Sequence, residues 1–366
     1  MPSPTKIKPI RAATLADVGR AAGVSAMAAS AVLNGARTSS RISEETRARI
    51  LEAAARLRYR PNATARALVN RRMNTIGVVV ALHDGDLNSY AMEVLTGILA
   101  ASTRHEQSTT MFTLHDWGRD SARLHGWCDG RVDGMILVAP TLARDDARSL
   151  PRHTPFVSIH SNIPLPEVVN IESDEERGAF EIVWYLIEQG HRRIMHVTGD
   201  SGLVGAERRI AGYKRALASA GIRFAKNLFV PGTFTPKDGC AAMRDWLKRN
   251  QGEPLPQAVF CANDGVATAC METFAEAGLR VPEDISVVGF DDTLAARTTM
   301  PQLTTVRQPL RDMGSRAVEV LLGIIQAHDA GRAAVDSPNP IVFPVQVVRR
   351  ASVGRPLQES RVVPHF

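Results

Sequence analysis

Residues 14–34 read TLADVGRAAGVSAMAASAVLN, a pattern that predicts two short helices joined by a tight turn. Thr14 is placed to cap the first helix, and Gly23 ends that helix where a left-handed residue costs least. Ser25 is placed to cap the second helix, residues 26–34. Such a pair suits the major groove of DNA, although a helical hairpin inside an ordinary protein core has the same pattern.

A third helix follows this pair. Ser43 and the two glutamates after it predict the start of that helix, and four apolar residues at helical spacing predict its buried stripe: Ile50, Leu51, Ala54 and Leu57. Pro61 ends the helix, because the residue before a proline is pushed out of the helical region. Asn62 is then placed to cap a short segment, residues 63–69.

The two segments TLADVGRAAGVSAMAASAVLNG and RISEETRARILEAAARLRYRPNATARAL resemble the DNA-binding head and hinge of the lactose-repressor (LacI/GalR) family of bacterial transcription regulators. This resemblance covers nearly all of residues 14–70. It implies a repressor that binds a palindromic double-stranded DNA operator as a homodimer, with one second helix in each of two successive major grooves. It also implies a small-molecule effector that switches DNA binding.

By this resemblance, Ser25 and Ser30 position the head on phosphates, while Ala26, Met27 and Ala31 occupy positions that read bases in relatives. Ala31 stands after Ser30 where many relatives have an arginine. We therefore expect base reading through apolar contacts, for example of Met27 or Ala31 with thymine methyl groups. In the family, a hinge leucine wedges between base pairs in the minor groove, and Leu68 is the matching residue here. The alternative role of Leu68 is a core contact between head and body. The candidate DNA contacts are Thr14, Ser25, Ala26, Met27, Ser30, Ala31, Asn34, Arg37, Tyr59, Asn62, Ala65 and Leu68.

Charge is distributed unevenly along the 366 residues. The net charge is +6, but residues 1–72 hold 14 Lys and Arg against 4 Asp and Glu, whereas the remainder holds 30 against 34. A basic segment on a mildly acidic body indicates a polyanion partner at one end only.

After residue 72 the pattern changes to alternating strands and helices. Apolar runs predict buried strands at residues 76–80, 135–138, 156–159, 194–197, 258–261 and 285–289. Helical periodicity lies between them, at residues 90–102, 177–188, 208–220, 237–249, 265–277 and 310–326. The predicted fold is therefore a small all-α helix-turn-helix head plus an α/β body, which the resemblance divides into two parallel-sheet subdomains of the type I periplasmic-binding-protein kind.

The expected domain organisation follows from these patterns and from the resemblance. We expect a disordered extension (1–13), a helix-turn-helix domain (14–61), a hinge helix and linker (62–74), an effector-binding and dimerisation domain (75–353) and a tail (354–366). Within the large domain, the N-subdomain is predicted at about 75–165 and 308–336, and the C-subdomain at about 166–307 and 340–353. The tail has no leucine heptads, which favours a dimer over a tetramer.

Polar residues just after predicted strands are the candidates for ligand binding, because ligands of open parallel sheets lie beyond the carboxyl ends of the strands. Taken alone, Asn263 reads as a helix cap and Asp291 as part of a turn. The resemblance implies instead that Arg209, Asn263 and Asp291 bind hydroxyl or charged groups of the effector, and that Phe234 stacks against a sugar face. Gln308 follows another strand candidate.

The opposite wall of the predicted cleft departs from the family. His160 stands where many relatives have an acid, and residues 87–90 replace a common Asn-Pro-Phe-Phe-like turn, although His160 also reads as an ordinary polar loop residue. The effector is expected to be a sugar or a sugar derivative, with a purine or nucleoside second. The candidate effector contacts are Asn88, Tyr90, His160, Arg209, Phe234, Asn263, Asp291 and Gln308.

Other functions fit less well. Residues 199–202, Gly-Asp-Ser-Gly, copy the run around the nucleophile of trypsin-like proteases, but here they join a predicted strand to a helix. No dinucleotide fingerprint, phosphate-binding loop or paired metal spacing occurs, so neither catalysis nor a cofactor or metal is expected. A sugar-binding transport or chemoreceptor component is the main alternative and a sugar-processing enzyme the third. The helix-turn-helix segment and the lack of a secretory signal both disfavour a transport or chemoreceptor component. Without a secretory signal or a long apolar run, we expect a cytoplasmic protein without membrane contact.

Overall fold

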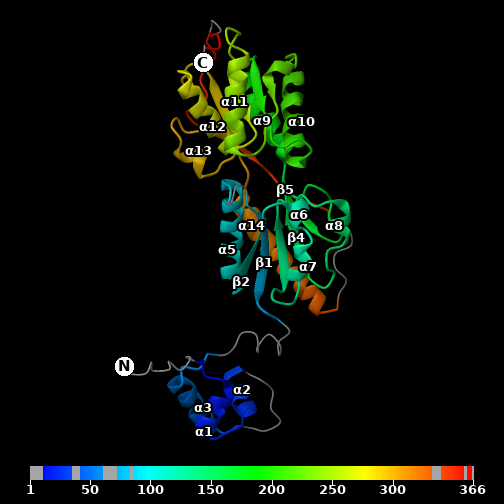
Figure 1. Ribbon diagram of the computed structural model, residues 1–366, viewed down its shortest axis with the longest axis vertical. Coiled ribbons are helices and arrows are strands. Elements are labelled where there is room, and N and C mark those ends of the chain that lie inside the picture. Colours follow the sequence, from blue (N-terminus) through cyan, green and yellow to red (C-terminus); the bar gives the residue numbers. More distant parts are fainter. Residues whose placement is uncertain are drawn as a thin grey trace, which may run out of the picture. The chain divides into compact units, whose positions relative to one another are not determined.

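The computed structural model describes residues 11–34, 42–60, 72–82, 86–331, 339–357 and 361–364. The chain divides into two compact units, Met1–Met73 and Asn74–Phe366, which we call the head and the body (Figure 1). Four of the predicted DNA contacts lie outside the described residues: Arg37, Asn62, Ala65 and Leu68. The predicted extension lies outside them up to residue 10.

The head consists of three described helices, α1 (Leu15–Ala22), α2 (Ala26–Asn34) and α3 (Glu44–Arg56). Val18, Ala29 and Ile50 are fully buried where the helices meet. The predicted stripe of α3 is wrong at Leu51, which is 51% exposed. Ala53 is buried instead, because residues three and four positions after Ile50 lie on its face of the helix, whereas the next residue, Leu51, is turned about 100° away from Ile50.

The first lobe of the body is built on a parallel sheet in the order β11-β5-β4-β3-β1-β2. Its strands are β1 (Thr75–Ala81), β2 (Ser108–Leu114), β3 (Gly134–Val138), β4 (Phe156–Ile159), β5 (Val169–Ser173) and β11 (Ile341–Phe343). Its helices are α5 (Ser89–Arg104), α6 (Trp117–Asp120), α7 (Arg123–Trp127), α8 (Arg144–Arg148) and α14 (Leu310–Asp329).

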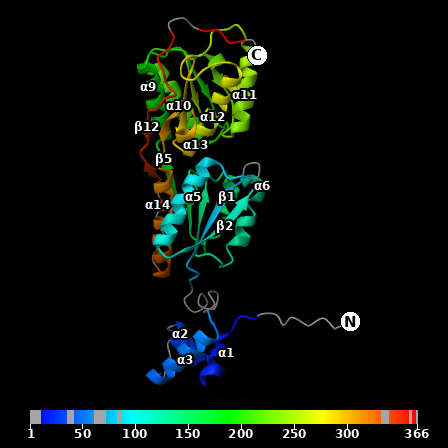
Figure 2. The same ribbon diagram turned by 90° about the vertical axis from the view of Figure 1, so that its left-hand side faces the viewer.

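Both faces of this sheet are covered, as its apolar strands require. Alternate side chains of a strand point to opposite faces. Ile76 and Val78 therefore pack with α5 and α14, whereas Val79 packs with the short helices α6, α7 and α8. Figure 2 shows α5 and α14 side by side along one face of the sheet.

The second lobe repeats this design in the order β12-β10-β9-β8-β6-β7, with only β12 antiparallel to its neighbour. Helices α9 and α10 cover one face, and α11 and α12 cover the other. The strands are β6 (Ile194–Val197), β7 (Phe229–Val230), β8 (Ala258–Cys261), β9 (Ser286–Asp291), β10 (Thr304–Arg307) and β12 (Gln346–Val348). The helices are α9 (Glu175–Glu188), α10 (Val204–Ser219), η1 (Lys226–Leu228), α11 (Pro236–Arg249), α12 (Asp264–Glu276) and α13 (Leu294–Thr298).

The chain passes between the lobes three times: after β5, after β10, and between β11 and β12. The predicted subdomain boundaries at residues 166 and 340 differ from this arrangement. They assign β5 and β11 to the second lobe, whereas both strands pair in the first sheet. A short strand carries no local mark of the sheet it joins, because its partner lies far away in the sequence. The predicted tail also differs, since Val363 is buried in the core of the second lobe.

Candidate functional site

Helix α2 presents the outer surface of the head. Ala26 is exposed and the side chain of Met27 is 74% exposed, whereas Ala29 on the opposite side of α2 is buried. Ala31 is half-buried. A large apolar side chain left in solvent at the start of a helix is available for contact with a partner surface.

The predicted polar contacts of the head have partners within the head. The Thr14 hydroxyl accepts from the Asp17 amide at 3.3 Å and the Thr14 amide donates to Asp17 Oδ2 at 2.9 Å, which together form a capping box. Ser25 Oγ accepts from the Ala28 amide at 3.1 Å. Ser30 Oγ accepts from Asn34 Nδ2 at 3.2 Å, which fixes both side chains on α2. Tyr59 is half-buried against the head core.

The carboxyl ends of the strands of the two lobes meet through a chain of hydrogen bonds. Tyr90 of α5 contacts His160 Nδ1 at 2.7 Å, and the Ser173 amide donates to His160 Nε2 at 3.2 Å. The hydroxyl of Ser173 donates to Gln308 Oε1, and Gln308 Nε2 donates to Asp291 Oδ1 at 2.6 Å. Tyr90 and His160 belong to the first lobe and Asp291 to the second, so the chain joins the two lobes at the junction where the sequence predicts the effector cleft.

Arg209 of α10 lies at the second-lobe end of this chain. Its Nη2 donates to Glu175 Oε1 at 2.8 Å and lies 3.8 Å from Asp291 Oδ1, and its Nη1 donates to the Ala262 carbonyl. The guanidinium lies over the ring of Phe290, 4.0 Å from its centroid. Only 6% of the side chain is exposed. The group is held on several sides and has little freedom to reorient.

The backbone of this region is strained at two positions. His160 has φ of 51° and Asp291 has φ of 118°, within the region that favours glycine. Such residues persist where the surrounding structure holds them, and they cluster at functional sites. The strain therefore marks the junction of β4 and β9 with the cleft as a candidate site.

Burial and charge shift the acidity of the cleft groups. Burial raises the pKa of Asp291 to about 6, although Arg209 opposes this shift. Burial together with Asp291 raises the pKa of Asp264 to about 8. Burial acts to raise the pKa of Glu175 as well, but Arg209 beside it brings that pKa below its ordinary value. Burial lowers the pKa of His160, which leaves a neutral ring near pH 7.

Comparison with known proteins gives a consistent result. Residues 14–62 match the bacterial regulatory proteins of the lacI family, and residues 183–353 match the periplasmic binding protein-like domain. The HTH-type transcriptional repressor PurR of Vibrio atlanticus is 34% identical over 324 residues, which cover 87% of this chain and 93% of that protein. This chain belongs to the LacI family of bacterial regulatory proteins. It is a DNA-binding transcriptional regulator with the predicted fold class, and not an enzyme.

Two solved structures support this assignment. The transcriptional regulator CelR–cellobiose complex is 31% identical with a TM-score of 0.66, and the match covers 93% of this chain and 99% of that one. The Lac repressor dimer bound to operator and the anti-inducer ONPF is 28% identical with a TM-score of 0.79, and the coverage is the same. LacI-family repressors bind operator DNA as dimers and respond to small-molecule effectors. A transport or chemoreceptor component is therefore not favoured.

Several predicted effector contacts of this LacI-family regulator carry structural hydrogen bonds. Asn88 Oδ1 caps α5 by accepting from the Ala91 amide at 2.8 Å. Asn263 Oδ1 caps α12 by accepting from the Val266 amide at 2.8 Å, and its Nδ2 donates to the Phe234 carbonyl at 2.9 Å. Capping, the alternative that the sequence left open for Asn263, is thus present, and Asn88 has the same role at α5. Their contact with an effector stays a prediction.

The Gly-Asp-Ser-Gly run has a structural role that explains its residues. The ring of Phe234 lies against Gly199, where a Cβ atom would overlap the ring, and the Phe234 amide donates to Asp200 Oδ2 at 3.0 Å. The loop therefore holds the aromatic side chain in place beside Arg209, whose guanidinium carbon is 5.2 Å from the ring centroid.

Three charged residues of the cleft were not predicted from the sequence. Glu175, at the start of α9, pairs with Arg209, and Arg208 donates to Glu172 Oε1 at 3.0 Å. The first-turn position of Glu175 reads as an ordinary acid at a helix start. The sequence does not reveal that the Glu175 side chain is only 4% exposed, because this burial arises only when α9 packs on α10.

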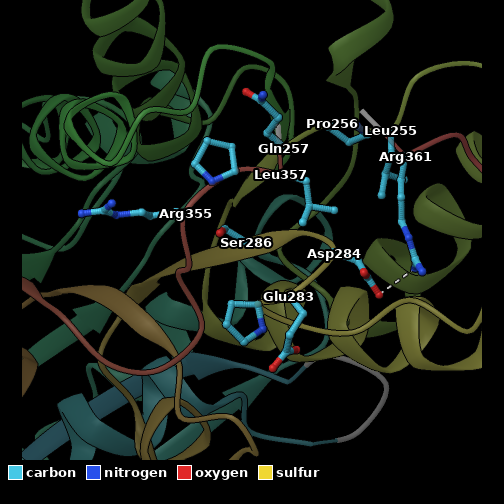
Figure 3. A pocket seen from close by; sticks show the side chains of 11 residues that line it. Leu255, Pro256, Gln257, Glu283, Asp284, Ser286, Arg355, Leu357 and Arg361 are labelled. Atoms are coloured by element: carbon cyan, nitrogen blue, oxygen red, sulfur yellow. Dashed lines mark ion pairs between the residues drawn. The ribbon is translucent and has the colours of Figure 1, made fainter. Parts of the chain in front are cut away.

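A hollow lies at the other end of the second lobe, at the amino ends of β8 and β9 (Figure 3). Arg361 crosses it to pair with Asp284 at 2.9 Å, and the Leu255 amide donates to the Arg361 carbonyl at 2.7 Å. These contacts attach the C-terminal segment to the lobe.

Among the described residues, no group of His, Cys, Asp and Glu side chains is arranged to hold a metal ion. In the same residues we find no helix with the length and apolar character that crossing a bilayer demands.

Proposed function

We propose that this regulator is a cytoplasmic repressor that binds a palindromic operator as a dimer, and that a sugar or sugar derivative binds between the lobes of its body. The hydrogen-bond chain from Tyr90 to Asp291 carries this proposal, because its members come from both lobes. A ligand that contacts both ends stabilises one arrangement of the lobes over another, which is the requirement for a switch. The cellobiose complex of CelR makes a sugar the first choice. A purine or nucleoside is the second.

We propose that α2 reads the operator mainly through apolar contact. Ala26, Met27 and Ala31 then face bases, and Ser25 and Ser30 lie near phosphates. The exposed thioether of Met27 supports this assignment, since thymine methyl groups are the apolar feature of the major groove. In the same proposal Leu68 wedges into the minor groove, and the remaining contacts are Thr14, Asn34, Arg37, Tyr59, Asn62 and Ala65.

DNA binding is tested with the purified protein and its own promoter region. We expect Met27→Ala to weaken binding about tenfold, which corresponds to about 1.4 kcal/mol, as fluorescence anisotropy measures it. Leu51→Ala is the matched control, because Leu51 is also a half-exposed apolar residue of the head but lies on α3. Binding should fall steeply with salt and disappear when residues 1–73 are removed. Retained binding by that truncated protein would contradict the proposal.

Effector binding is tested at Asp291. Asp291→Ala removes the acceptor that faces Gln308 and Arg209, so we expect loss of the effector response with operator affinity unchanged. The measurement is operator binding with and without a ligand found in a thermal-shift screen of sugars, nucleosides and purines. A variant that responds to this ligand like the natural protein would remove Asp291 from the site.

A further inference from the structure

The charged groups of the cleft form one connected cluster. Arg209 pairs with Glu175 and lies 3.8 Å from Asp291, while Arg208 pairs with Glu172 at 3.0 Å and lies 3.8 Å from Glu175. The three carboxylate side chains are largely buried: Glu175 is 4% exposed, Asp291 5% and Glu172 10%. Carboxylates thus outnumber guanidinium groups in this cluster, and both guanidinium groups already have carboxylate partners.

His160, on the opposite wall, adds no positive charge. Its Nδ1 lies 2.7 Å from the Tyr90 oxygen, and its Nε2 lies 3.2 Å from both the amide and the hydroxyl of Ser173. Burial lowers the pKa of His160, so the ring is neutral near pH 7.

An anion that enters such a cleft meets two costs. It lies within a few ångströms of buried carboxylates, where repulsion is only weakly screened by solvent. An anion that takes the Nη groups of Arg208 or Arg209 from their present partners also leaves a buried carboxylate without its counter-charge. A neutral molecule with several hydroxyl groups meets neither cost. Its hydroxyls donate to Asp291 and Glu175, and its oxygens accept from Tyr90 and the arginines.

We propose that the cleft selects uncharged, hydroxyl-rich effectors, such as neutral sugars and glycosides, and rejects sugar acids and sugar phosphates. This inference rests on the proposed function and names the ligand class of the same site. Glu175 and Asp291 determine the selectivity, because they occupy Arg209 and supply the repulsion.

Inorganic phosphate tests the proposal without knowledge of the natural effector. We expect millimolar phosphate to bind the natural full-length protein no more tightly than it binds Arg208→Ala, because any phosphate binding at low ionic strength then belongs to the basic head and not to the cleft. The double variant E175Q/D291N leaves Arg209 without carboxylate partners and should bind phosphate at least about tenfold more tightly. Glu176→Gln is the control: it removes one acid from the same helix, but Glu176 faces outward toward Arg215 and is 41% exposed. If the double variant does not fold, Glu172→Gln removes the nearer carboxylate partner of Arg208 and should raise phosphate affinity by a smaller factor, because Glu175 stays 3.8 Å from Arg208.

Either of two results overturns the charge selection: phosphate binding by the natural protein that Arg208→Ala weakens, or no gain of phosphate affinity in the folded variants. Glucose, glucuronate and glucose 6-phosphate provide a second comparison, because they share one ring and differ in charge. If either anionic sugar binds more tightly than glucose, the charge selection is also wrong. Operator affinity, measured on the same samples, distinguishes a failure of the charge selection from a failure of the proposed function. An anionic sugar that changes operator affinity contradicts only the charge selection, whereas a protein that does not bind its promoter contradicts the proposed function.

Discussion

Arg209 and Asp264 show how single buried groups set the chemistry of the cleft. Arg209 is a buried cation whose partners, Glu175 and Asp291, are themselves buried. Removal of one partner of such a pair costs roughly 3–5 kcal/mol, because the remaining charge is left without compensation. Asp264 differs, since its contacts are the hydroxyls of Thr293 and Thr305 and the Thr293 amide, none of which carries charge.

Asp264 should make stability fall as the pH rises from 6.5 to 8. Its pKa is raised from 3.8 to about 8 by burial and by Asp291, so the folded protein holds a proton that the unfolded chain releases. The free energy of unfolding then decreases by up to about 1.4 kcal/mol per pH unit in this window. Buried His160, His191 and His196 have lowered pKa values and produce the opposite trend, but only below their ordinary pKa of 6.5.

Asp264→Asn should flatten this pH dependence, because asparagine keeps the shape of the protonated acid and has no proton to lose. Urea unfolding between pH 6.5 and 8 measures the slope. Asp238→Asn is the control, since the pKa of Asp238 is lowered and that acid is ionised throughout the window. An unchanged slope in the Asp264 variant would show that this group is already ionised at pH 6.5.

At the scale of elements, the first lobe depends on the close packing of α5 and α14. Gly97 and Gly314 face the partner helix, where a Cβ atom would overlap the carbonyl oxygen of Arg311 or of Val94. The two backbones therefore approach more closely than any larger residue permits. This contact covers one face of the first sheet with the apolar sides of both helices.

Gly97→Ala should destabilise the body by about 1–3 kcal/mol, since the added methyl group forces α5 and α14 apart. Gly323→Ala is the matched control on α14, because nothing lies within 4 Å of its Cβ position. We expect that variant to gain up to about 1 kcal/mol from helix propensity. Thermal and urea unfolding of both variants provide the comparison, and equal stabilities would contradict the close-packing argument.

For the body as a whole, a few polar contacts join the two lobes around the cleft. Glu93 of α5 pairs with Arg297 of α13 at 3.4 Å and with Arg311 of its own lobe at 2.5 Å. Asn162, after β4, accepts from the Val204 amide at the start of α10 at 2.7 Å. Because the Glu93–Arg297 and Asn162–Val204 contacts form only when the lobes approach, these two contacts favour the closed arrangement.

Glu93→Gln should make the lobes open more readily. The lost ion pair is partly exposed and is worth about 0.2–1 kcal/mol, so we expect effector affinity to fall by up to about fivefold. Hydrogen exchange at the ends of the strands, with and without the effector, reports the opening. Glu319→Gln is the control, because Glu319 pairs with Arg316 inside α14 and joins no lobes. If both variants behave alike, Glu93 does not hold the lobes together.

Local patterns were sufficient for much of this protein. The caps at Thr14, Ser25 and Ser43 and the apolar runs of six strands lie where the sequence predicted them. Each of these features depends on neighbours within a few residues, so spacing alone reveals it. β2 was not predicted, because an edge strand with exposed residues such as Met111 has no continuous apolar run.

The remaining features arise only from contacts between distant segments. Whether β5 and β11 join the first or the second sheet depends on partners that lie far away in the chain. Glu175 reads as a surface acid until α9 packs on α10, and its burial then creates the ion pair with Arg209. Periodicity fixes which residues face inward on their own element, but the dielectric and the charges around them depend on what packs against that face. The sequence of this regulator therefore predicts many of its helices and strands, whereas the charge balance of its cleft depends on how the folded chain packs.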